Sequence, residues 1–316
     1  MTVSNSTNYI VSSRDIIQEA LEQLGVLGEG EEVSDDQYRS SLRTLNMMVK
    51  NWQADGLNLF AVQELYLFPK LNQKKYSLNN STTDHITTSF VETTTSAAAS
   101  SGASTVVLTS GTGIADNDYI GIKLSSSEAL HWTTVSDASG SPSIVLTDAL
   151  PDDVDSGAVV YAYTTKADRP MKLLETYIHR FNGTEVPVGQ LSRVDYNKLS
   201  DKDTTGTTNQ IYFDPQLSAS YVTLWPVNSS ERDYFRLVVQ RTLNDFDCSN
   251  NTPDYPQEWH LPLAFGLAVL VSNKYGTPDS IYKRVFSIAA GLYDVASGFD
   301  EEANTSVYFS PSGNYQ

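Results

Sequence analysis

Histidine is well suited to proton transfer and metal binding near neutral pH, and this chain of 316 residues has four of them. None has a second histidine four residues away, as a helical zinc site of the HExxH kind requires. They are His85, His131, His179 and His260. His179 lies in an alternating, strand-like run, where a structural role is favoured over one as a ligand or a base. The histidines therefore predict neither a catalytic centre nor a metal site.

Motifs for nucleophiles and phosphate binding are also missing from the sequence. The serines include no Gly-x-Ser-x-Gly elbow, and no GxxxxGK[ST] phosphate loop occurs. Gly25, Gly28 and Gly30 follow a predicted helix, whereas a dinucleotide fingerprint follows a strand. The single cysteine, Cys248, has no partner for a disulfide within the chain and argues against metal ligation by sulfur. We expect no cofactor and no bound metal.

Clustered carboxylates leave one further route to chemistry, because a pair can cleave glycosides and a larger group can bind Ca²⁺. Asp116 and Asp118 fall in one predicted turn, and Asp152, Asp153 and Asp155 fall in another. Neither turn shows the twelve-residue calcium-loop pattern with its central glycine and terminal glutamate. Binding of local turn amides is the favoured interpretation of these side chains.

The charge balance limits the partners that the chain can have. Its 38 acidic and 21 basic residues give a net charge of -17, which argues against tight binding of nucleic acid. An acidic wall could still face DNA that slides past it, although improved solubility is the simpler interpretation. No basic segment followed by an apolar run opens the sequence, and Leu261–Val271 is too short to span a bilayer. We expect synthesis in a reducing cytoplasm and no membrane partner.

The elements that would position these residues begin with a helical hairpin, Ser12 to Phe60. Helical spacing of apolar residues predicts a first helix that stops at Gly25. A second helix follows Ser34 and Gln37, which have the form of a capping box, and ends near residues 55–56. We expect the apolar stripe of this hairpin to pack partly on C-terminal helices near Leu267 and Ile288.

Composition changes sharply near residue 80 and changes back near residue 166. Residues 81–165 hold ten acidic residues, one lysine and no arginine, in a background of Ser, Thr, Ala and Gly. Short β-type runs separated by turn residues predict an inserted all-β domain, either a sandwich or a barrel-like fold. The predicted strands are Ile86–Val91, Thr105–Thr109, Tyr119–Leu124, Leu130–Val135, Ile144–Thr147 and Ala158–Tyr163.

The flanking segments, 1–80 and 166–298, are interpreted as one core. Strand patterns flank the insertion, residues 190–199 are predicted as a short helix, and three runs between 211 and 240 are predicted as a meander. Two further helices begin after Pro256 and Pro278. The fold class is therefore α+β, with N-terminal and C-terminal helices around a small β-rich middle that carries the inserted domain.

Residues 299–316 form a polar tail that carries four aromatic residues. They are Phe299, Tyr308, Phe309 and Tyr315. Aromatic anchors are typical of interfaces, so these residues are the candidate contacts with a portal protein or another partner. A frayed terminus is the alternative interpretation.

Motifs along the chain resemble those of the head-to-tail adaptor family of short-tailed bacteriophages, also called tail accessory factors or packaged-DNA stabilisation proteins. The resemblance covers most of the chain outside the insertion. It is carried, in order, by Glu19–Glu31, Leu42–Leu57, Arg169-Pro-Met-Lys172, Tyr196–Lys202, Tyr212-Phe-Asp-Pro215, Leu224-Trp-Pro226 and Pro256–Ala268. Each string alone is weak, and their shared order makes the match specific.

The resemblance implies a structural virion protein that forms a ring of twelve copies beneath the portal, at the head–tail junction. There the ring would extend the DNA channel, help retain packaged DNA, let double-stranded DNA pass without sequence-specific binding, and contact tail nozzle or tail-fibre proteins. We expect the inserted domain on the outside of the ring. A virion-associated hydrolase that cleaves cell-wall glycans with paired carboxylates remains the alternative, and the adaptor interpretation predicts no enzyme activity.

Overall fold

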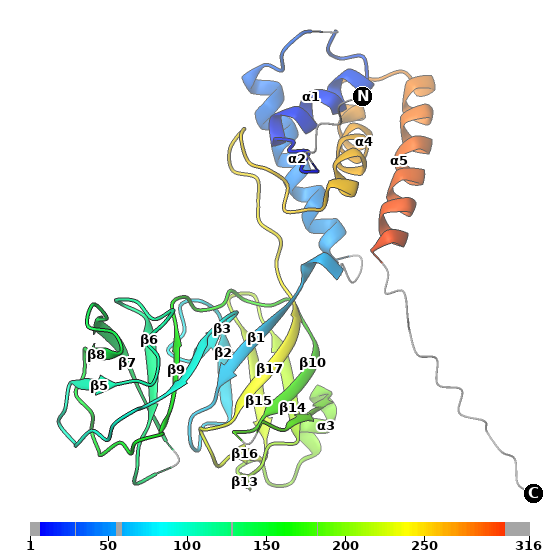
Figure 1. Ribbon diagram of the computed structural model, residues 1–316. Helices are drawn as coiled ribbons and strands as arrows, with labels where there is room; N and C mark the ends of the chain where they lie inside the picture. Colours follow the sequence, from blue (N-terminus) through cyan, green and yellow to red (C-terminus); the bar gives the residue numbers. More distant parts are fainter. Residues whose placement is uncertain (1–6, 29, 55–58, 128, 182, 301–316) are drawn as a thin grey trace, which may run out of the picture. The chain divides into compact units, whose positions relative to one another are not determined.

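The structure of the chain is a computed structural model that describes residues 7–28, 30–54, 59–127, 129–181 and 183–300. It mixes helices and sheets, which confirms the α+β class (Figure 1). The chain divides into two compact units. The helical unit combines residues 1–61 with residues 243–316, and the β unit spans residues 62–242.

The helical unit draws its elements from both ends of the chain. They are α1 (Ser13–Gln23), α2 (Asp35–Ala54), η1 (Leu59–Ala61), η2 (Gln257–Trp259), α4 (His260–Val271), η3 (Ser272–Lys274) and α5 (Asp279–Phe299). Glycine ends α1 as predicted, because Gly25 has a φ of 69° that side chains rarely tolerate. The predicted capping box opens α2: the Ser34 N–H donates to Gln37 Oε1 at 3.1 Å, and the Gln37 N–H donates to Ser34 Oγ at 3.4 Å.

The core of the helical unit is centred on α4, which is apolar on all sides. Leu267 of α4 is fully buried in one cluster with the apolar residues of α1 and α2, so the packing expected there is confirmed. The expectation for Ile288 is wrong, because this side chain of α5 is 41% exposed. Val285 of α5 is buried, and at helical spacing Ile288 lies to the side of that position.

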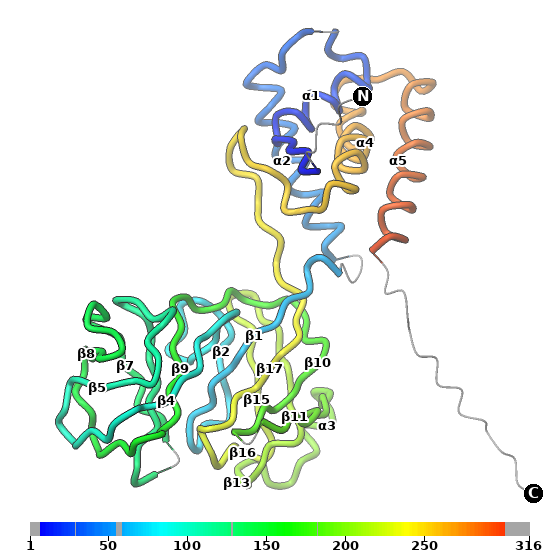
Figure 2. Tube along the Cα trace, in the orientation of Figure 1, coloured from blue at the N-terminus to red at the C-terminus, as the bar shows by residue number. Residues whose placement is uncertain are grey.

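The described residues of the β unit form four sheets. The five-stranded sheet comprises β11 (Glu185–Pro187), β10 (Lys172–His179), β17 (Tyr234–Gln240), β1 (Val62–Phe68) and β3 (His85–Thr87), in that order. The four-stranded sheet comprises β12 (Gly189–Leu191), β14 (Gln210–Pro215), β15 (Ser220–Trp225) and β2 (Lys75–Leu78). A two-stranded sheet pairs β13 (Thr205–Gly206) with β16 (Val227–Asn228). The tube in Figure 2 follows the chain through them.

The five-stranded and four-stranded sheets share one apolar cluster. Leu67 and Phe235 come from the five-stranded sheet, and Ile211 and Val222 come from the four-stranded sheet. The predicted meander is wrong in part. β14 and β15 do form a hairpin, but β17 joins the other sheet, between β10 and β1. The helix predicted for residues 190–199 is shorter than expected, since α3 (Arg193–Lys198) begins only after the extended cap Ser192.

The six-stranded sheet is built from residues 91–163. Its order is β4 (Val91–Thr94), β9 (Val159–Tyr163), β6 (Tyr119–Lys123), β7 (Leu130–Asp137), β8 (Ser143–Leu146) and β5 (Thr105–Val107). A bridge between Thr95, after β4, and Leu108, after β5, brings the two edges of the sheet together. The sheet is therefore curled around its own apolar cluster, within the β unit.

Aromatic residues join the six-stranded sheet to the rest of the β unit. Phe68 at the end of β1 is fully buried, with its ring centroid 5.2 Å from Trp132, 5.0 Å from Tyr161 and 6.0 Å from Tyr234. The buried carboxylate of Glu231 accepts the Leu71 N–H and the Leu130 N–H, each at 2.5 Å. These contacts tie β7 and β9 to β1 and to the turn that follows it.

Candidate interaction surface

Helix α5 exposes apolar side chains along much of its length. Of its 21 residues only Val285 and Ala296 are buried. Three apolar side chains remain exposed on one flank: Ile288 at 41%, Val295 at 73% and Phe299 at 75%. Their positions, seven and four residues apart, lie along one side of a helix. We call these three residues the α5 stripe.

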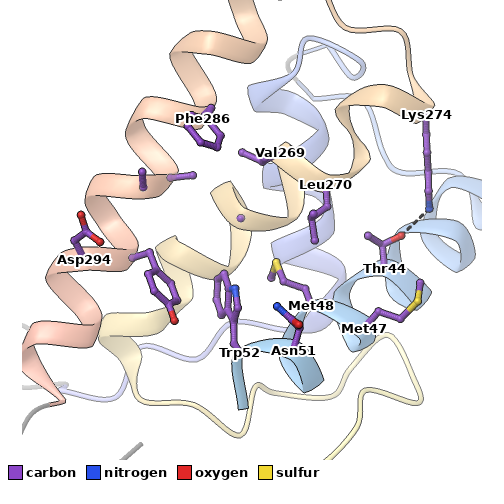
Figure 3. Close-up of a pocket in the computed structure, with 14 residues that line it drawn as sticks. Thr44, Met47, Met48, Asn51, Trp52, Val269, Leu270, Lys274, Phe286 and Asp294 are labelled. Carbon is purple, nitrogen blue, oxygen red and sulfur yellow. Dashed lines mark hydrogen bonds between the residues drawn. The ribbon is translucent and has the colours of Figure 1, made fainter. Parts of the chain in front are cut away.

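The opposite flank of α5 forms a groove with α2 and α4. Figure 3 shows the side chains that line this groove. Its volume is about 680 Å³. Apolar side chains make up most of its lining, which includes Met47, Met48 and Trp52 of α2, Leu270 of α4, and Phe286, Ala290 and Tyr293 of α5. Leu270 and Phe286 are about half exposed, at 49% and 53%. An apolar groove of this size is typical of a binding surface.

Trp52 lies in the groove because α4 has a glycine beside it. A Cβ at Gly266 would come within 2.8 Å of Trp52 Cζ2 and within 3.1 Å of Met48 Sδ. The Trp52 ring also packs against Tyr293 of α5, with centroids 5.1 Å apart. Met48 and Trp52 belong to the apolar side of α2 that packs on the core, and this packing leaves part of that side open to the groove.

Polar groups stand at the margins of the groove. Lys274 Nζ donates to Thr44 Oγ1 at 2.6 Å and to the Ser40 carbonyl at 3.2 Å, and Figure 3 shows this lysine beside Thr44. Asp294 lines the groove on the side of α5. A ligand in the groove would therefore contact mostly apolar side chains, with the Lys274 ammonium group at one margin and the Asp294 carboxylate at another.

The end of α5 is held against the N-terminal half of the helical unit. The Leu59 N–H donates to Asp300 Oδ2 at 3.2 Å. Burial raises the pKa of the Asp300 carboxyl, while the hydrogen bonds from the Phe60 and Leu59 backbone act in the opposite direction. This contact fixes the point from which the C-terminal residues leave the helix.

Of the aromatic residues predicted as partner contacts, only Phe299 falls within the described chain, and it belongs to the α5 stripe. Tyr308, Phe309 and Tyr315 lie outside the described residues. The groove was not predicted from the sequence. A signal for it was present in α5, where Phe286 and Tyr293 add apolar positions beyond those that one packed face needs.

The histidines lie in different environments and do not meet. His85 is buried, lies within 2.8 Å of Tyr163 Oη through Nδ1, and stacks on Trp132 with centroids 3.9 Å apart. Burial, with a smaller contribution from Lys70 and Lys166, lowers the pKa of His85 to about 3. His179 stacks on Tyr234. These contacts are structural ones.

The clustered carboxylates bind nearby backbone amides. Asp116 Oδ1 accepts the Ala138 N–H at 2.7 Å, and Asp118 Oδ2 accepts the Ala115 N–H at 2.8 Å. Asp153 Oδ1 accepts the Ser101 N–H at 2.8 Å. Among the residues that the structure describes, no three His, Cys, Asp or Glu side chains are grouped to hold a metal ion. The turns use these carboxylates to satisfy local donors.

Comparison with known proteins adds no relative: no family model matches the chain, and no curated protein matches it. No helix within the described ranges is both long enough and apolar enough to cross a bilayer.

Proposed function

We propose that this chain is a subunit of a head-to-tail adaptor, a ring of twelve copies that joins the portal of a bacteriophage to its tail. The observation that carries the proposal is α5, a long helix at the end of the described chain with an exposed apolar stripe. An apolar flank of this kind is stabilised when a neighbouring subunit covers it, and a closed ring provides that cover for every copy.

The order of the family-like motifs supports the same proposal. The hairpin motifs fall on α1 and α2, Arg169–Lys172 leads into β10, and the motif at residues 212–215 lies in β14. Residues 256–268 lead into and form much of α4. The motifs that carry the resemblance therefore fall on elements of both units, in chain order.

The charge of the chain suits a channel through which DNA moves. With a net charge of -17 per copy, a ring repels the DNA backbone and does not retain it by phosphate contacts. We propose that residues 81–165 lie on the outside of such a ring, with tail proteins as their neighbours. Density for these residues inside the channel would refute that placement.

The test is to mix the purified chain with a portal ring and to measure the mass of the product. We expect a complex with one adaptor per portal subunit, and Val295→Asp should prevent it because the aspartate places a charge in the α5 stripe. Leu217→Asp is the matched control, since Leu217 is 96% exposed on the β14–β15 turn.

Two results would contradict the proposal. One is that the chain forms neither a ring nor a portal complex at any ratio. The other is clearing of cell-wall glycan in a zymogram that disappears when Asp116 or Asp118 is replaced by Asn, which would identify the hydrolase instead.

A further inference from the structure

We propose that the groove between α2, α4 and α5 binds one amphipathic helix of a partner protein. The helix runs antiparallel to α2 and α5, with its N-terminal end at Asp294 and its C-terminal end at Lys274. The groove and the α5 stripe lie on different flanks of α5, so this contact is separate from ring formation and does not depend on it.

Contacts at the two ends of the groove fix the directions of its three helices. At one end Lys274, which follows α4, donates to Thr44 Oγ1 of α2 at 2.6 Å. At the other end the Trp52 ring of α2 lies 5.8 Å from that of Trp259, which precedes α4, by centroid distance. α5 begins shortly after Lys274 and packs on Trp52 through Tyr293. α2 and α5 therefore run in the same direction, and α4 runs opposite to both.

Each of these helices leaves one large apolar side chain about half exposed at the groove. They are Met47 of α2 at 59%, Leu270 of α4 at 49% and Phe286 of α5 at 53%. A helix laid between α2 and α5 would cover all three, with its own apolar side chains at i, i+3, i+4 and i+7 facing α4. Methionine and aromatic side chains pack well on such a face.

The charges at the two ends of the groove set the direction of the bound helix. Lys274 Nζ donates to Thr44 Oγ1, to the Ser40 carbonyl and to Ser40 Oγ. These acceptors are uncharged, so they do not neutralise the ammonium group. Asp294 is exposed at the margin on the side of α5. Because a helix is partly positive at its N-terminus and partly negative at its C-terminus, it is most stable with its N-terminus at Asp294 and its C-terminus at Lys274.

The length of the groove suits a short helix. Thr44 and Trp52, which mark its two ends on α2, are about 12 Å apart along the helix axis at about 1.5 Å per residue. A partner helix of about three turns spans this length. A helix that short is only marginally stable alone in water, so the partner segment should become helical on binding.

The same direction argues against the α5 helix of a neighbouring ring subunit as the occupant. Neighbours in a ring of twelve are related by one twelfth of a turn, so their α5 helices run in nearly the same direction. In the groove, the α5 of a neighbour would therefore place its negative C-terminal end beside Asp294. A helix from a different protein has no such restriction.

Selection from a library of displayed helical peptides, on the purified full-length chain, tests the proposal. The peptides have about 14 residues, and those that also bind Leu270→Asp are removed. We expect the retained peptides to carry apolar residues at i, i+3, i+4 and i+7 and to become helical on binding, measured by circular dichroism. Met47→Asp should weaken their binding by at least about tenfold, because the aspartate would be buried under the peptide. Val295→Asp is the matched control: it places the same charge on the other flank of α5 and should bind as the wild type does.

A nitroxide on one end of a retained peptide measures the direction of binding. Trp52 lies at the Asp294 end of the groove, so a nitroxide at the peptide N-terminus should quench tryptophan fluorescence more than one at the C-terminus. Trp52→Phe shows how much of the quenching comes from this ring. Asp294→Asn should weaken binding about two- to fivefold, since it removes the charge that faces the helix N-terminus.

Four outcomes would overturn the proposal. The first three are that no peptide is retained, that retained peptides bind without becoming helical, and that the C-terminal nitroxide quenches more strongly. The fourth is self-association of the isolated chain that Leu270→Asp abolishes and Val295→Asp does not, which would identify a second copy as the occupant. The peptide measurements need no portal, so a failed portal complex would not affect them, and their failure would leave the ring proposal standing.

Discussion

Replacing Phe68 by Ala should destabilise the β unit more than any other single truncation of its aromatic cluster. The side chain is fully buried, and five aromatic rings lie between 5.0 and 6.2 Å from it, counted by centroid distance. Truncation of a buried Phe to Ala costs about 3 to 5 kcal/mol, and loss of favourable ring pairs adds to that cost. We expect a loss of about 4 kcal/mol in the free energy of unfolding.

Guanidinium unfolding followed by near-ultraviolet circular dichroism and by tryptophan fluorescence measures this loss. Trp132 reports on the cluster directly, because its ring centroid is 5.2 Å from that of Phe68. With a slope of about 4 kcal/mol/M, the midpoint for the β unit should fall by about 1 M. Leu217→Ala, at a side chain that is 96% exposed, should change stability by less than about 0.5 kcal/mol.

The reasoning would be refuted if Phe68→Ala lowered the free energy of unfolding by less than about 1.5 kcal/mol. It would also be refuted if the six-stranded sheet unfolded in a separate earlier transition in the wild type. In that case the cluster would not couple the sheets, and the contacts of Phe68 would contribute little.

Three further predictions concern buried polar groups and a tight helix contact. The folded chain holds His85 neutral, so the unfolded chain binds more protons than the folded one below about pH 6.5. The free energy of unfolding should therefore fall by about 2 kcal/mol from pH 7 to pH 5. Urea unfolding measures this change, and His85→Phe should remove it. Glu231→Gln should cost about 1 to 3 kcal/mol in thermal unfolding, since an amide NH₂ would face a backbone N–H. In Gly266→Ala, the crowding of the new methyl group against Trp52 should lower the free energy of unfolding by about 1 to 3 kcal/mol. The higher helix propensity of Ala should offset about 1 kcal/mol of that loss. The fluorescence of Trp52 should shift.

Each of these predictions has a control or a result that would contradict it. Gly291→Ala places the same methyl group on α5, where no atom lies within 4 Å, and should stabilise the helix by up to about 1 kcal/mol. A pH dependence that is the same in His85→Phe as in the wild type would contradict the first prediction. A Glu231→Gln variant as stable as the wild type would show that the two backbone amides find other acceptors.

Sequence patterns predicted the elements well and their partners poorly. Most strands between residues 81 and 165 were found to within a few residues, because alternation and turn residues are local signals. The prediction of one strand at Ile86–Val91 was wrong, since this run is divided between β3 in the five-stranded sheet and β4 in the six-stranded sheet. The position of β17 was missed, since the partners of a strand depend on contacts far away in the sequence. The α2 cap was predicted because Ser34 and Gln37 lie three residues apart.

The groove could not be predicted from spacing alone. The groove depends on the spacing between α5 and the helices α2 and α4. That spacing is set by contacts of α5 such as those of the buried Val285 and Ala296 and the hydrogen bond of Asp300. Gly266 is a further example: a glycine in a helix suggests flexibility, yet its role here is to admit the Trp52 ring. Such a role appears only when both helices are in place.

The strand pairing brings together the two ends of the β unit and, within it, the two ends of the six-stranded sheet segment. Val62 at the start of β1 pairs with Gln240 at the end of β17, so the entry to the β unit and the exit from it are neighbours. The same holds one level further in, where Val91 of β4 pairs with Ala162 of β9. Either segment can therefore be exchanged for a shorter or longer one while the ends that receive it stay where they are. Removal of the inner segment would take away Trp132, Tyr161 and Tyr163, three of the five rings around Phe68.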